Sequence, residues 1–105
     1  MLRLFLIVTV VVGINFPAPS NAASPDLASE TFVRGLDTPW ALDFAPDGRI
    51  FISERPGRIR IVEQGQLRPE PWMTLEVAAV GEAGLLGLAV DPQFSQNRFL
   101  YVAYS

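Results

Sequence analysis

Short runs of alternating apolar and polar residues, separated by turn residues, dominate the middle of the chain. In "PWALDFAPDGRIFISERPGRIRIVE" the apolar residues Trp40, Leu42 and Phe44 alternate with small or charged ones. Successive side chains of a strand point to opposite faces of its sheet, so this period of two indicates strands. Pro-Asp-Gly at 46–48 and Pro-Gly at 56–57 supply turns. The pattern predicts an antiparallel meander over 40–45, 49–54 and 58–62.

Further strand signals follow the meander. The segment "PWMTLEV" (71–77) predicts an edge strand, because Pro69 and Pro71 exclude an inner position. The segments 84–90 and 98–104 are predicted to pair in a second sheet, and no segment has convincing helical periodicity. The aromatic run over 99–104 is typical of a strand buried on both faces, which needs neighbours on each side. We therefore expect the sequence to be the beginning of a longer protein.

The second hairpin repeats the first. Aligning "LDFAPDGRIFISE" with "LAVDPQFSQNRFLYVA" places Leu42 on Leu88 and Phe44 on Val90, an offset of about 46 residues. This period is typical of radial β-repeats with four strands per blade, although chance similarity of two hairpins is the alternative. The repeat predicts an all-β fold, the N-terminal part of a β-propeller with about one and a half blades.

The first residues have the pattern of a secretory signal peptide. A charged start is followed by an apolar run over 4–14 and by small residues at Ser20 and Ala22. The run is shorter than the roughly 20 residues of a membrane-spanning helix, which makes an uncleaved anchor the weaker alternative. The chain has no cysteine for a lipid anchor. We predict a signal peptide over 1–22, a flexible lead over 23–29 and a periplasmic or secreted domain over 30–105.

Composition restricts the chemistry. Beyond Ala22 the chain carries seven Arg against eleven Asp and Glu, without a basic cluster, so we expect no nucleic-acid partner. The sequence contains no His, Cys or Lys. It therefore offers no imidazole base, no thiolate and no amine for a Schiff base. Any chemistry of these residues rests on carboxylates, hydroxyls and Arg.

The sequence resembles the opening of the glucose/sorbosone dehydrogenase family. The motifs "PWAL", "PDGR", "ERPGR" and "GEAGLLGLAVDPQF" occur in the family's order and spacing over 32–105. The resemblance implies a six-bladed propeller that oxidises aldose sugars with pyrroloquinoline quinone (PQQ) and calcium and passes electrons to an external acceptor. It also places the histidine base, the calcium ligands and most quinone-binding residues further along the family's chains. By the resemblance, these 105 residues alone are inactive.

Glu82 is the candidate site residue. It lies in "GEAGLL", just ahead of a predicted innermost strand, where a loop opens on the central channel of a propeller. In the family, the polar residue two places before "GLL" borders the sugar and quinone site. A carboxylate there can accept hydrogen bonds from sugar hydroxyls; an exposed loop acid without function is the alternative. No catalytic or metal-binding residue is assigned.

Two other functions remain open. A propeller can bind a carbohydrate or a protein without catalysis, because one fold carries many functions. A calcium-dependent, lactonase-like hydrolase is the weaker third hypothesis. A histidine base with further acidic and basic site residues in the same protein would favour the dehydrogenase, and their loss would favour the binding protein.

Overall fold

The computed structural model describes Pro17 and residues 25–105. Within them the chain forms β1 (Pro39–Phe44), β2 (Ile50–Glu54), β3 (Arg58–Glu63), β4 (Gln66–Leu67), β5 (Met73–Thr74), β6 (Leu85–Val90), α1 (Phe94–Asn97) and β7 (Leu100–Tyr104). Apart from Pro17, the signal peptide predicted over 1–22 lies outside the described residues, as does the start of the predicted lead. In the described part of the chain, no helix is long and apolar enough to cross a membrane.

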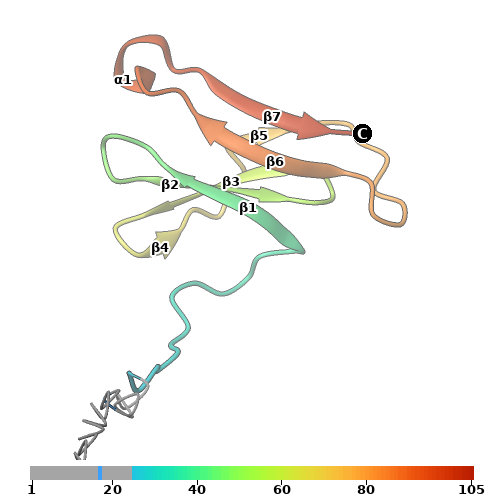
Figure 1. Ribbon diagram of the computed structural model, residues 1–105. Helices are drawn as coiled ribbons and strands as arrows, with labels where there is room; N and C mark the ends of the chain where they lie inside the picture. Colours follow the sequence, from blue (N-terminus) through green and yellow to red (C-terminus); the bar gives the residue numbers. More distant parts are fainter. Residues whose placement is uncertain (1–16, 18–24) are drawn as a thin grey trace, which may run out of the picture.

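The strands form two antiparallel sheets. β1, β2, β3 and β4 follow one another in the first sheet, where β5 also pairs with β3, and β6 pairs with β7 in the second. Figure 1 shows the second sheet lying beside the first, with β6 against β1. The predicted meander and the predicted pairing of 84–90 with 98–104 are confirmed.

Local turn chemistry explains the meander. At the β1–β2 turn, Gly48 has a φ of 91°, and the Asp47 carboxylate accepts hydrogen bonds from the Arg49 amide at 3.0 Å and from Arg49 Nε at 2.8 Å. The hydrogen bond from the Arg49 amide is the main cause that lowers the pKa of Asp47. At the β2–β3 turn, Gly57 has a φ of 117°, and a Cβ there would lie 2.2 Å from the Leu75 carbonyl oxygen. Both glycines occupy conformations that other residues rarely adopt.

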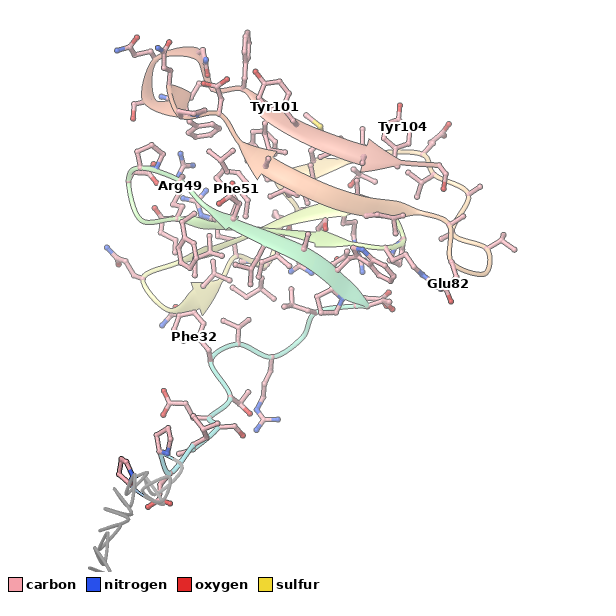
Figure 2. The ribbon with its side chains drawn as sticks, viewed as in Figure 1. Phe32, Arg49, Phe51, Glu82, Tyr101 and Tyr104 are labelled. Carbon is pink, nitrogen blue, oxygen red and sulfur yellow. The ribbon has the colours of Figure 1, made fainter. Side chains whose placement is uncertain are left out.

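The core lies between the two sheets. Phe51, Ile59 and Ile61 of the first sheet are buried together with Leu85 and Phe94. From the second sheet, partly buried side chains pack against this cluster: Leu88, Val90, Leu100 and Val102. Figure 2 shows the Phe51 side chain on the side of β2 that faces the second sheet. Burial of these apolar side chains is what holds the two sheets together.

The outer face of β1 is apolar but uncovered. Trp40, Leu42 and Phe44 are 50%, 57% and 63% exposed. These three side chains lie on one face of the strand, whereas the residues between them face the second sheet. The alternation in the sequence therefore predicts the strand correctly, and its larger side chains face away from the core in this chain.

The repeat is confirmed with two differences in detail. Leu42 pairs with Ile52 in the first sheet, and Leu88 pairs with Val102 at the equivalent place in the second. The longer second turn contains the short helix α1, which the sequence pattern does not predict. The edge strand expected over 71–77 is reduced to β5, and the short β4 precedes it on the same neighbour, β3. The chain thus has the architecture of about one and a half propeller blades.

Candidate functional site

The candidate site lies where the inner strands β1 and β6 begin. Pro39 at the start of β1 pairs with Glu54 at the end of β2. The β2–β3 turn meets the loop ahead of β6 at this end, because the Leu85 amide donates to the Arg55 carbonyl. Figure 2 shows Glu82 at this end, on the tip of the loop ahead of β6. The opposite end carries the β1–β2 turn and α1.

Glu82 projects from a tight turn. The Ala83 amide donates to the Val80 carbonyl at 3.0 Å, and Gly81 has a φ of 59°. Glu82 is exposed, and its carboxylate forms no ion pair within the part of the chain that the structure describes. The structure therefore presents this carboxylate free for an external hydrogen-bond donor.

Arg55 connects the β2–β3 turn to this loop. Its Nη1 donates a hydrogen bond to the Gly81 carbonyl, and its own carbonyl accepts one from the Leu85 amide at 2.9 Å. A Cβ on Gly84 would lie 2.4 Å from the Arg55 carbonyl oxygen. Gly84, with a φ of 134°, thus permits a close approach of the two backbones. No local sequence pattern identifies Arg55 as the residue that Gly84 approaches.

A buried ionic cluster supports the turn. The Glu54 side chain is fully buried and accepts hydrogen bonds from Arg58 Nε at 2.7 Å, Arg60 Nη1 at 3.2 Å and the Asp37 amide at 2.7 Å. The two positive charges compensate the buried carboxylate. Charged residues at alternate positions of a strand, such as Arg58 and Arg60, are expected to face water, but Arg60 is only 8% exposed. Sequence proximity would pair Glu54 with Arg55 and Arg58, whereas the second cation of the cluster is Arg60.

The two acids with lowered pKa values, Asp47 and Asp91, lie away from Glu82. The Tyr101 hydroxyl donates to Asp91 at 2.7 Å, which lowers the pKa of Asp91 and raises the pKa of Tyr101. The Gln93 amide and Asn97 side chain donate to the same carboxylate. Asp91 therefore stabilises the turn around α1, as Asp47 stabilises the β1–β2 turn. Neither is arranged as a metal ligand.

The described residues do not complete a cofactor site. Within residues 25–105 and at Pro17, the structure contains no group of three or more His, Cys, Asp or Glu side chains that could hold a metal ion. Calcium requires at least six oxygen ligands, so these residues do not fit a calcium site. A quinone with several carboxylates needs several cationic or amide donors, and Arg55, the cation that contacts the Glu82 loop, already donates to Gly81.

Comparison with known proteins places this geometry in a family. The chain is 35% identical to the aldose sugar dehydrogenase YliI of Escherichia coli over 86 residues, which cover 80% of this chain and 23% of that protein. The PQQ-bound aldose sugar dehydrogenase of Streptomyces coelicolor superposes with a TM-score of 0.66 at 29% identity, covering 72% of this chain and 23% of that one. The mouse Hedgehog-interacting protein is 32% identical over 75% of this chain and 13% of its own length.

The chain thus spans less than a quarter of the length of these relatives. The family model for glucose/sorbosone dehydrogenases matches residues 36–105, which include both sheets and the loop that carries Glu82. Each sheet begins with an antiparallel hairpin in chain order, β1–β2 and β6–β7, as the repeat of successive propeller blades requires. Because that match extends over two thirds of the sequence, this chain belongs to the glucose/sorbosone dehydrogenase family.

Proposed function

We propose that this chain supplies one edge of the sugar site in an exported quinoprotein that oxidises aldose sugars with PQQ and calcium. Membership of the family and the likeness to sugar dehydrogenases support this general kind of function. The sugar substrate, the quinone, the calcium ion and the external electron acceptor are part of the proposal for the complete propeller. The preferred sugar is left open.

The proposal rests on the position and the exposure of Glu82. Its carboxylate is exposed and unpaired within the described residues, at the end of the sheets where both inner strands begin. The turn that carries it is fixed by hydrogen bonds to Val80 and Arg55. A fixed, unpaired carboxylate suits the recognition of hydroxyl groups, because it can accept several hydrogen bonds. In the proposal it orients the sugar.

The catalytic base and the cofactor ligands would come from other blades. The sequence contains no His, Cys or Lys, and the described residues fit neither a calcium site nor a complete quinone site. Bound PQQ would accept the electrons removed from the sugar. We infer that the 105 residues on their own do not oxidise aldoses.

A chimera tests the role of Glu82. Residues 36–105 would replace the matching segment of E. coli aldose sugar dehydrogenase, and the product would be loaded with PQQ and calcium. Replacing Glu82 with alanine is expected to lower kcat/KM for an aldose by an amount equivalent to about 1 to 3 kcal/mol, the cost of losing a hydrogen bond to a charged group. Dye reduction by the purified chimera measures the effect.

Glu76→Ala provides the matched control for this experiment. Glu76 is an exposed acid in the segment between β5 and β6, and its removal should leave kcat/KM unchanged. The isolated chain with added PQQ and calcium should reduce no dye. Equal kinetics of the Glu82→Ala chimera and the parent chimera would contradict a role in sugar binding.

A binding protein without catalysis is the second candidate. The observation in its favour is the likeness to the mouse Hedgehog-interacting protein, whose name describes an interaction rather than a reaction. The turns and the sheet packing described above would serve a binding protein as well as an enzyme. A folded chimera that binds PQQ but oxidises no aldose would favour this candidate.

We also propose export to the periplasm or the medium. The support is the apolar run over 4–14 with small residues before the predicted cleavage position, Ala22. Expression of the C-terminally tagged chain in E. coli should give a product that begins at Ala23 or within one residue of it. N-terminal sequencing measures this, and a product that retains Met1 would count against export by a cleaved signal.

A further inference from the structure

We propose that Arg55 is the positioning residue for Glu82, and this inference rests on the proposed function of Glu82. Arg55 is not adjacent to Glu82 in the chain, yet it contacts the loop on both sides of that residue. Its Nη1 donates to the carbonyl of Gly81, directly before Glu82, and its carbonyl accepts from the amide of Leu85, three residues after it. The side chain and the backbone of one residue therefore clamp both stems of the turn.

The close approach at Gly84 strengthens the clamp. A Cβ on Gly84 would lie 2.4 Å from the Arg55 carbonyl oxygen and 2.7 Å from the Arg55 Cγ. Because Gly84 has no side chain, the loop packs directly on the backbone and the aliphatic part of Arg55. Within Val80–Gly84 the turn contains a single hydrogen bond, from Ala83 to Val80. Ser105 also holds Gly84, through the Ser105 amide and hydroxyl, but among the described residues only Arg55 forms a hydrogen bond with Gly81, directly before Glu82.

Arg55 is itself held by the first sheet. Its amide donates to the Thr38 carbonyl at 3.0 Å, which ties it to the start of β1. The preceding residue, Glu54, is fixed by Arg58 and Arg60 in the buried cluster. Arg55 therefore holds the loop ahead of β6 in a fixed position relative to the first sheet. A side chain that is held by packing and hydrogen bonds on a sheet places a site residue more precisely than a free loop does.

Arginine suits this task better than a shorter or neutral side chain. Its guanidinium reaches the Gly81 carbonyl while its Nε is buried without a partner in the described structure. A buried donor without a partner costs free energy, so Nε itself does not stabilise this arrangement. The charged donor also strengthens the hydrogen bond to Gly81.

The first test measures loop order in the 105-residue chain, without cofactor or sugar. Arg55→Met keeps the aliphatic stem but removes the hydrogen bond to Gly81. We expect amide hydrogen exchange at Ala83 to become about tenfold faster, because the turn opens more often. The Leu85 amide, which donates to the Arg55 backbone, should change less. Arg55→Lys, which retains a charged donor, should restore part of the protection.

Arg68→Met is the matched control, because Arg68 is an exposed arginine paired with Glu63. It should leave exchange at Ala83 unchanged. Unchanged exchange in Arg55→Met would overturn the inference. If Arg55→Met unfolds the chain, Arg55→Lys provides the comparison: it should exchange at Ala83 faster than the parent chain, and equal rates would overturn the inference.

The second test measures coupling in the chimera loaded with PQQ and calcium. We expect Arg55→Met to lower kcat/KM about tenfold in the parent but to have almost no effect in the Glu82→Ala background, because a positioning residue acts through the residue it positions. Equal effects in both backgrounds would overturn the inference. Faster exchange at Ala83 together with unchanged kinetics of Glu82→Ala would instead uphold the clamp and contradict the proposed function of Glu82.

Discussion

Replacing Glu54 with alanine is expected to lower the free energy of unfolding of the chain by about 3 to 5 kcal/mol. The carboxylate is fully buried and is the counter-ion of Arg60, whose side chain is 9% exposed. Its removal would leave that guanidinium buried without a negative charge and the Asp37 amide without its acceptor. Urea denaturation followed by circular dichroism measures the change.

A second glutamate in the same sheet provides the control. Glu63 pairs with Arg68, and the two side chains are 40% and 48% exposed. Water screens this pair, so Glu63→Ala should cost less than about 1 kcal/mol. Glu54→Gln, which keeps the shape but loses the charge, should fall between the two alanine variants. A loss in Glu54→Ala no larger than in Glu63→Ala would show that the buried cluster contributes little.

Replacing Phe51 with alanine is expected to lower the free energy of unfolding by about 3 to 5 kcal/mol as well. The ring is fully buried, and its centroid lies 5.2 Å from that of Trp72 and 5.4 Å from that of Phe94, both in edge-on arrangements. The variant would leave a cavity between the two sheets and remove these aromatic contacts. Equilibrium denaturation, followed by tryptophan fluorescence and circular dichroism, measures the effect.

Phe44→Ala is the corresponding control, because the Phe44 side chain is 63% exposed on the outer face of β1. Its loss should change the free energy of unfolding by less than about 1 kcal/mol. Similar losses in the two variants would mean that the space between the sheets is not the core of the isolated chain. Phe51→Leu should recover part of the stability, because it refills most of the cavity.

The strands were predictable from the sequence because the signals that define them are local. Turn residues at 46–48 and 56–57 determine where each strand ends, and the period of two in the apolar residues identifies the strands between them. The helix α1 was not predictable, because four residues show no periodicity. The alignment of the two hairpins leaves more residues for the second turn than for the first. It gave no sign that Phe94 would fill the core against Phe51.

The candidate site was predictable in part. Glu82 could be located from its place before an innermost strand, and the structure exposes it there. The contact of Arg55 with the loop of Glu82, at Gly81, spans 26 residues and joins two sheets, so no local pattern encodes it. The burial of Arg60 could not be predicted from the sequence for a similar reason. Charged residues that alternate along a strand usually face water, and the compensating Glu54 comes from the neighbouring strand.

The uncovered face of β1 has a consequence for self-association. Leu42 and Phe44 correspond by the repeat to Leu88 and Val90, which pack against the Phe51 cluster within this chain. The surface that β6 buries is therefore repeated on β1, where it is uncovered. The outer face of the second sheet, which includes the exposed Tyr101, corresponds to the surface on which β6 packs. Contacts between two different surfaces do not close into a two-fold dimer. Copies of this chain with both surfaces uncovered would associate head to tail into open-ended assemblies. The geometry that packs one propeller blade on the next therefore also favours this association.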